Sequence, residues 1–181
     1  MGRMHVQRAI QTAGNPAVIV CSDVSDLRLQ DLQDSFAAEA EARGIEFICL
    51  NPMQRERYAA GLARFRECGF DDILVLAPIA AVVAEAATWL GERGVMNLFA
   101  GLTRGTMAAL DLSAALFKGA RVIGHSASTI DDLRLMLHQA ECGQLSPNRS
   151  VAAVGSLEAA RDGLQAVLET SFPGKVVIYP Q

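Results

Sequence analysis

The sequence predicts an α/β fold in which helices flank a parallel sheet. Apolar runs of strand length alternate with stretches of helical periodicity along most of the chain, which is the order of repeated strand–helix–strand units. The runs are apolar at successive positions, as expected of strands that are buried on both faces of a parallel sheet. With 181 residues, 51% of them hydrophobic, the chain can bury one core, or one domain with a small annex.

The first part of the chain has clear helix and strand boundaries. An opening helix stops at Gly14 and Pro16. Ser25 or Asp26 caps the next helix, which Gly44 ends. The expected elements are a helix over 2–12, a strand over 17–22, a helix over 26–43, a strand over 45–50 and a helix over 55–68.

The alternation continues through the middle of the chain. One strand breaks at Pro78, and Thr129 with Asp132 forms a capping box for the last helix of this part. The expected elements are a strand over 72–77, a helix over 79–91, a strand over 95–100, a short polar stretch, a strand over 120–124 and a helix over 129–142. The pattern indicates about five strands, all joined by crossovers.

The residues from about 145 onward differ in character and indicate an annex. We expect a strand over 150–154, an amphipathic helix over 157–170 and a strand over 175–179, for which the sequence indicates no partner. We therefore predict a main domain over residues 1–144 and a small helix–strand annex over residues 145–181.

Composition limits the classes of partner. The net charge of −4 provides no basic surface for a phosphate backbone, so nucleic acid is not expected as a partner. No apolar run reaches the roughly 18 residues of a membrane span, and the start lacks the apolar segment of a signal peptide. We expect a cytoplasmic protein with no membrane contact.

The cysteines and histidines indicate no metal centre formed within the chain. The four cysteines are far apart and form no C-x-x-C pair, and the three histidines are equally scattered. Cys21 and Cys49 lie inside apolar strand-like runs, where a thiol behaves as a small hydrophobic group. Free, reduced cysteines are the simplest interpretation.

The opening residues have the order of a dinucleotide-binding unit. A helix starts at Gly2, and the strand that follows ends on Asp23, about twenty positions later. In such units the glycine lets the backbone approach a pyrophosphate at the helix N-terminus, and the acidic residue contacts the adenosine ribose. Asp23 is equally consistent with a helix cap or a loop position. Arg28 could contact the adenosine region, pair with Asp23, or simply be a surface arginine on a helix.

Several motifs together carry a family resemblance that spans nearly the whole chain. They are Met1-Gly2-x-Met4-His5, the strand ending in Asp23 with Arg28 five residues later, the segment Asn97-Leu98-Phe99-Ala100-Gly101, and the closing Phe-Pro-Gly-Lys-Val-Val-Ile-Tyr-Pro. With these motifs the chain resembles the C-terminal half of a zinc-dependent medium-chain dehydrogenase. Within that superfamily it is most similar to the branch of polyol, sugar-phosphate and threonine dehydrogenases.

The resemblance implies a Rossmann domain with strand order 3-2-1-4-5-6, whose first and central strand would precede Met1. A central strand buries three or four aliphatic side chains at roughly 1.5–3 kcal/mol each, against a total domain stability of about 5–15 kcal/mol. Three outcomes follow for the chain. The strands that carry Val18 and Leu74 pair directly, another chain supplies the missing strand, or the polypeptide folds poorly. Open sheet edges or the last strand are then expected to promote self-association.

The resemblance also implies a set of cofactor-binding positions. Gly2 and Arg3 would lie at the pyrophosphate, and Asp23 and Arg28 at the adenosine ribose. The nicotinamide half would be bordered by residues that end two strands, namely Ala77, Pro78, Phe99, Ala100 and Gly101. Arg104 with Ser126 or Ser128 are further candidates, for a substrate phosphate.

The predicted function is therefore the cofactor-binding portion of an NAD(P)-dependent alcohol or polyol dehydrogenase. NAD is favoured over NADP because the Asp23 carboxylate would repel a 2′-phosphate. The family uses zinc to polarise the alcohol oxygen, but no zinc ligands and no catalytic residues can be named in this chain. Two alternatives remain at this point: a nucleotide-binding or self-associating module without catalysis, and a domain similar to S-adenosylmethionine-dependent methyltransferases.

Overall fold

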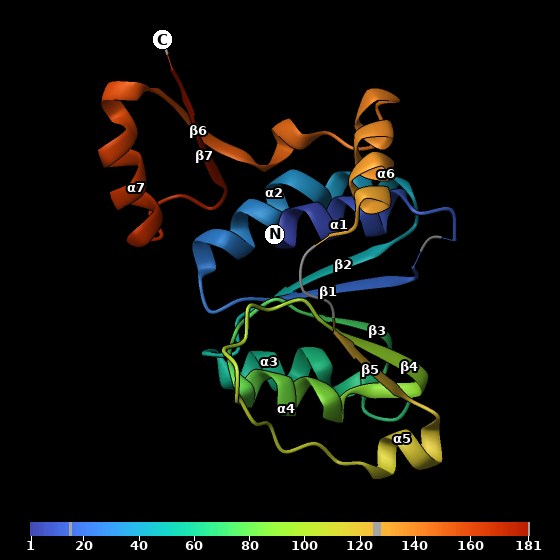
Figure 1. Cartoon of the computed structure of the whole chain (residues 1–181). Helices are drawn as coiled ribbons and strands as arrows, with labels where there is room; N and C mark the ends of the chain where they lie inside the picture. The colour runs from blue at the N-terminus through green and yellow to red at the C-terminus, as the bar shows by residue number, and fades with distance from the viewer. Residues whose placement is uncertain (15, 125–127, 181) are drawn as a thin grey trace. The chain divides into compact units, whose positions relative to one another are not determined.

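The computed structural model describes residues 1–14, 16–124 and 128–180. Parallel strands alternate with helices, which confirms the predicted α/β class (Figure 1). The chain divides into two compact units. Unit 1 comprises Met1–Tyr58 and Leu133–Gln181, and unit 2 comprises Ala59–Asp132. The predicted boundary between residues 144 and 145 is not a boundary between these two compact units. The predicted division into a main domain and an annex stays a prediction.

Unit 1 begins with two helices that cover one face of a parallel strand pair. Its first elements are α1 (Gly2–Gln11), β1 (Val18–Ser22), α2 (Asp26–Ala42) and β2 (Glu46–Leu50). The strands pair in register from Val18 opposite Glu46 to Ser22 opposite Leu50. The expected cap is present, since the Ser25 hydroxyl accepts a hydrogen bond from the Arg28 amide at the start of α2.

The core of this part lies between the two helices and the strands. Ile10 of α1 and Phe36 of α2 are almost completely buried, and Val6, Ala40 and Ile45 complete the cluster. Alternate residues of the strands, Ile19 and Cys21 of β1 and Phe47 of β2, pack against it. The period-two pattern of β1 and the 3.6-residue pattern of α1 thus meet in one apolar layer.

The later elements of unit 1 include residues 145–181, the stretch predicted as an annex and called the annex below. α6 (Ile130–Glu141) leads into it and starts with the predicted capping box, in which the Thr129 hydroxyl accepts from the Asp132 amide at 3.1 Å. The annex contains short 3₁₀ turns (Pro147–Ser150 and Leu157–Ala159), β6 (Val151–Ser156), α7 (Ala160–Leu168) and β7 (Lys175–Tyr179).

The partner of the last strand was not predicted, and the structure supplies it. β7 pairs in parallel with β6, and α7 forms the crossover between the two strands. Two glycines allow the close packing: a Cβ at Gly163 of α7 would lie 3.2 Å from Val176, and one at Gly155 of β6 would lie 3.0 Å from Ala159. Sequence periodicity identifies the strand but cannot show which neighbour it has.

Unit 2 contains a three-stranded parallel sheet in the order β3–β4–β5. α3 (Arg55–Leu62) and a 3₁₀ turn (Ala63–Phe65) precede it, and its elements are β3 (Phe70–Val75), α4 (Ala80–Thr88), β4 (Leu90–Leu98), α5 (Ser113–Lys118) and β5 (Arg121–Gly124). Val75, Val83, Leu90, Met96 and Ala120 form its core.

Two boundaries in unit 2 differ from the prediction. The helix predicted over 79–91 ends at Thr88, because β4 already begins at Leu90. A Cβ at Gly91 would lie only 2.5 Å from the Cys68 carbonyl oxygen, so the glycine permits a close approach of two backbones there. α5 lies in a stretch predicted to be irregular, and its six residues are too few for a periodic signal.

The strand order within each of the two sheets agrees with a part of the Rossmann order. β1 pairs with β2 in one sheet, and β3, β4 and β5 form another. In the order 3-2-1-4-5-6 these are the neighbours on either side of the first strand. The strands that carry Val18 and Leu74 are assigned to different sheets, one in each unit.

Candidate nucleotide-binding site

Asp23 lies at the carboxyl end of β1, in the turn that leads into α2. Its Oδ1 accepts a hydrogen bond of 2.9 Å from the Ser25 amide, and Arg28 Nη1 lies 3.4 Å from both carboxylate oxygens. The Asp23 amide donates to the Leu50 carbonyl at 3.4 Å, which extends the strand pairing to this residue. The carboxylate is therefore held in one orientation, while its side chain stays 29% exposed and accessible to a ligand.

The first turn of α1 lies at the same end of the strand pair. Figure 1 shows α1 running opposite to β1, so that its N-terminal end lies toward the end of the strand that carries Asp23. Burial lowers the pKa of the Met1 amino group, and the positive charges of Lys175 and Arg28 lower it further. Because Arg28 also binds Asp23, the N-terminal end of α1 and the carboxylate share one neighbourhood. Gly2 is the first residue of the helix.

Asn51 was not singled out from the sequence, yet it organises this end of unit 1. Its side chain, in a residue only 7% exposed, donates to Asp26 Oδ1 at 2.7 Å and to the Val24 carbonyl at 3.2 Å. Its Oδ1 accepts from the Met53 amide at 2.9 Å. Asn51 thus ties the end of β2 to the turn of Asp23. An asparagine directly after a strand and before Pro52 was the available signal.

Arg3 is held by groups of unit 1. Its Nε donates to the Arg149 carbonyl at 2.8 Å and its Nη2 to the Ser35 hydroxyl at 3.2 Å, and it forms an ion pair with Asp31. The guanidinium also lies over the Phe36 ring. These contacts connect α1 to α2 and to the 3₁₀ turn before β6. A cofactor contact by the Arg3 side chain stays a prediction, and its backbone amide remains part of the first turn of α1.

The candidates in unit 2 follow two neighbouring strands. Ala77 and Pro78 come directly after β3, and Phe99, Ala100 and Gly101 come directly after β4. The Phe99 amide donates to the Val75 carbonyl at 3.0 Å, so the two strand ends lie side by side. Phe99 is 37% exposed, and a Cβ at Gly101 would meet no atom within 4 Å. These two positions are therefore open to solvent.

Asn97 is a second polar residue that the sequence did not indicate as functional by itself. Its Oδ1 is buried without a hydrogen-bond partner, two residues before Phe99 on β4. Buried carbonyl oxygens are satisfied in most proteins, so this atom is a candidate acceptor for a donor group at the end of the sheet. Of the further candidates, Arg104 and Ser128 are exposed, and Ser126 lies outside the described residues.

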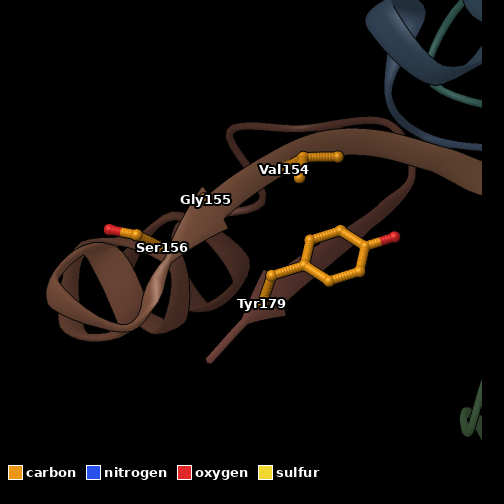
Figure 2. Close-up of a pocket in the computed structure, with 4 residues that line it drawn as sticks. All are labelled: Val154, Gly155, Ser156 and Tyr179. Atoms are coloured by element: carbon orange, nitrogen blue, oxygen red, sulfur yellow. The ribbon is translucent and has the colours of Figure 1, made fainter. Parts of the chain in front are cut away.

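Two cavities among the described residues are lined by residues other than those predicted for the site. One of about 460 Å³ lies in the annex and is lined by Val154, Gly155, Ser156 and Tyr179. Figure 2 shows the Tyr179 ring beside β6, with its hydroxyl directed away from Ser156. This lining carries no charged side chain and offers no set of groups for catalysis. A second cavity, of about 310 Å³, adjoins α5 in unit 2 and includes Asp111 and Lys118 in its lining.

The described residues contain neither a candidate metal-binding cluster nor a candidate membrane-spanning helix. Over 1–14, 16–124 and 128–180, no three histidine, cysteine or acidic side chains lie together in a way that could hold a metal ion. Within the same ranges, no helix combines the length and the apolar character needed to cross a membrane.

Solved structures define the class of fold. The 2R,3R-butanediol dehydrogenase of Bacillus subtilis matches with a TM-score of 0.70 at 17% identity, over 97% of this chain and 48% of that protein. A putative zinc-binding dehydrogenase of Clostridium scindens matches with a TM-score of 0.75 at 16% identity, over 99% of this chain and 47% of that protein. L-idonate 5-dehydrogenase of Escherichia coli matches with a TM-score of 0.70 at 17% identity, over 98% of this chain and 47% of that protein. The chain therefore has the Rossmann-like fold found in about half of each of these enzymes.

Curated sequences give more particular relatives. The chain is 28% identical over 183 residues to mannitol-1-phosphate 5-dehydrogenase of Aliivibrio fischeri, with 99% of this chain and 43% of the relative covered. It is 32% identical over 167 residues to the uncharacterized protein YggP of Escherichia coli, with 88% of this chain and 38% of the relative covered. The chain spans about two fifths of the length of these relatives. No protein-family model matches it.

These comparisons agree with the resemblance to zinc-dependent medium-chain dehydrogenases and are consistent with a C-terminal half of such an enzyme. The similarity to a mannitol-1-phosphate dehydrogenase agrees with the polyol and sugar-phosphate branch. The alternative of a methyltransferase-like domain is not favoured by any of these matches.

Proposed function

We propose that the chain is the cofactor-binding portion of an NAD-dependent alcohol or polyol dehydrogenase. The observation that carries the proposal is the placement of Asp23: its carboxylate is oriented by Ser25 and Arg28 at the carboxyl end of β1, toward the N-terminal end of α1. The relatives named for dehydrogenase activity on alcohols and polyols support the reaction class. A neighbour of the same fold is described in complex with NADH, which supports a dinucleotide cofactor.

The geometry of unit 1 fits the adenosine half of a dinucleotide. Asp23 can accept hydrogen bonds from both ribose hydroxyls, because Ser25 and Arg28 leave part of the carboxylate exposed. The backbone amides of the first turn of α1, from Gly2 onward, point toward the pyrophosphate position, where the helix dipole favours negative charge. Arg28 and Lys175 add positive charge to this neighbourhood.

The charge of Asp23 favours NAD over NADP. A carboxylate at the ribose repels the 2′-phosphate of NADP, whereas it accepts hydrogen bonds from the 2′-hydroxyl of NAD. Arg28 forms an ion pair with the Asp23 carboxylate. Removal of the carboxylate would release Arg28 to bind a phosphate.

In unit 2 we propose that the strand-end residues Ala77, Pro78, Phe99, Ala100 and Gly101 border the nicotinamide. Ala77 and Ala100 are small and Gly101 has open space at its Cβ position, which suits a ring, and the buried Asn97 Oδ1 can accept from a donor on the ligand. The bound cofactor would supply the hydride acceptor, while these residues position its ring. The described residues of this chain provide no set of zinc ligands, so no step is assigned to a metal here.

Isothermal titration with NAD and NADP tests the proposal. The wild-type chain should bind NAD more tightly than NADP. The Asp23→Ser variant should lose about 1.5–3 kcal/mol of NAD binding, because hydrogen bonds to a charged group contribute about that much. It should also gain affinity for NADP. The Asp34→Ser variant, altered at an exposed position on α2, serves as the control and should bind as the wild type does.

Two results would reject the function. No heat and no thermal shift with millimolar NAD, from a chain that circular dichroism shows to be folded, would leave only an interaction module. Binding of S-adenosylmethionine in place of NAD would indicate the methyltransferase alternative.

We also propose a cytoplasmic location, because the cysteines of the described residues are free and reduced thiols persist in that compartment.

A further inference from the structure

Cys21 and Cys49 are direct partners in the parallel pairing of β1 with β2. Side chains of directly paired residues project from the same face of a sheet. Cys21 packs against the core formed by α1 and α2, as do Ile19 two residues before it and Phe47 two residues before Cys49. Both thiols therefore lie on the helix-covered face, and the thiol of Cys21 hydrogen-bonds to that of Cys49.

The spacing of the strands suits a covalent link between the two sulfurs. Paired strands lie about 4.7–4.9 Å apart, which falls within the range of about 4.4–6.8 Å between the Cα atoms of a disulfide. The Cα spacing of the two residues is therefore in the range of a disulfide. Both residues are only partly buried.

The two thiols differ in their environment. The hydrogen bond from Cys21 lowers the pKa of the Cys49 thiol. The same hydrogen bond, together with burial and the charge of Cys49, raises the pKa of Cys21. Thiolates are the nucleophiles in thiol–disulfide exchange, so Cys49 is the attacking residue and Cys21 the resolving one.

We propose that Cys21 and Cys49 form a thiol–disulfide exchange site for a low-molecular-weight disulfide such as oxidised glutathione. The Cys49 thiolate attacks one sulfur of the reagent, breaks its disulfide and releases one glutathione thiolate. The Cys21 sulfur then attacks Cys49 Sγ, releases the second glutathione and transfers its proton to that leaving thiolate. The protein is oxidised by two electrons, and one oxidised glutathione becomes two reduced ones.

The other two cysteines provide an internal comparison. Cys68 and Cys142 are exposed and lie in other elements of the chain. The Cys68 thiol has the Phe65 carbonyl as its partner, and the Cys142 thiol lies beside His138. Neither has a second thiol at hand, so each should stop at a mixed disulfide with glutathione.

The experiment uses the full chain and a Cys68→Ser/Cys142→Ser variant, each incubated with oxidised glutathione. In the variant both remaining thiols should disappear, with no glutathione retained and with the peptides of Cys21 and Cys49 linked in a mass map. A reductant should restore both thiols. With Cys21→Ser added, the reaction should stop at a stable glutathione adduct on Cys49.

Mapping the wild-type chain gives the same answer without any substitution, so a folding defect of a variant cannot obscure the result. Two outcomes overturn the proposal: both thiols stay free in the folded chain, or Cys49 retains glutathione although Cys21 is present. The site does not depend on the proposed cofactor function, because the thiol measurement involves no nucleotide.

Discussion

Asp23 shows how a single residue serves both the fold and the proposed site. Its carboxylate accepts a hydrogen bond from the Ser25 amide, and this hydrogen bond shapes the turn into α2. The carboxylate also forms an ion pair with Arg28. The sequence offered a helix cap, a loop position and a ribose contact as separate interpretations. The structure shows that the capping role belongs to Ser25 and that Arg28 is a partner of Asp23, which leaves part of the carboxylate exposed for a ligand.

Asn51 is expected to stabilise the same turn, because it is buried and bonds to Asp26, Val24 and Met53. Asn51→Ala should lower the free energy of unfolding by about 1–3 kcal/mol, since partner groups lose buried hydrogen bonds. Urea denaturation measures this change. Gln54→Ala is the matched control, because Gln54 also donates to Asp26 but is exposed, and it should change stability by less than about 0.5 kcal/mol. Equal effects of the two substitutions would contradict the role of Asn51.

At the scale of elements, an ion pair joins α2 to the 3₁₀ turn that precedes β6. Arg149 Nη1 lies 2.6 Å from Glu39 Oε2, its Nη2 donates to the Ser35 carbonyl at 2.7 Å, and its guanidinium lies over the Phe36 ring. Burial alone would raise the pKa of Glu39, but hydrogen bonds from Arg149 and Gln11 outweigh it and hold the pKa below the ordinary 4.5.

The lowered pKa of Glu39 predicts a pH-dependent contribution to stability. This contribution is present above pH 4.5, where the carboxylate is charged in both states, and it is lost as the pH falls through the lower folded-state pKa. Glu39→Gln should therefore lower the melting temperature at neutral pH, and the difference from wild type should narrow below pH 4.5. Thermal melts at several pH values measure it, with exposed Glu41→Gln as the control. A difference that is independent of pH would show that the charge is not the cause.

The elements themselves were largely predictable, and the errors have physical causes. Hydrophobic periodicity and caps located α1, β1, α2, β2 and β7 within a few residues. The early start of β4 depends on the close approach of Gly91 to the backbone near Cys68, which no local pattern records. β7 pairs with β6, and Asn51 makes buried contacts with residues that are distant in sequence. Such contacts cannot be predicted from the local sequence around one strand or one asparagine.

At the scale of the whole molecule, the arrangement of strands bears on self-association, which stays a prediction. The amides of Glu46 and Asp23 bond across β1 and β2 through the Ala17 and Leu50 carbonyls. Backbone groups of alternate residues in a strand point to opposite sides. The N–H and C=O of Ile19 and Cys21 therefore point toward β2, and those of Val20 point toward the other edge of β1. In the β1–β2 sheet, this edge has no paired strand among the described residues.

We expect this edge of β1 to pair with a second copy at high protein concentration, because an unpaired row of backbone groups is a template for another strand. Val20→Pro removes one outward N–H while leaving the bonds to β2 in place, so it should reduce the fraction of dimer seen by size-exclusion chromatography across a concentration series. Val20→Ala is the control at the same position, because it shortens the side chain but keeps the N–H, and its dimer fraction should stay closer to that of wild type. Equal dimer fractions for the proline variant and the wild type, with unchanged circular dichroism, would place any association elsewhere, such as at β7. Saturating NAD should leave the dimer fraction unchanged if this edge alone mediates the contact, since the proposed nucleotide contacts lie at the end of β1 and not along its edge.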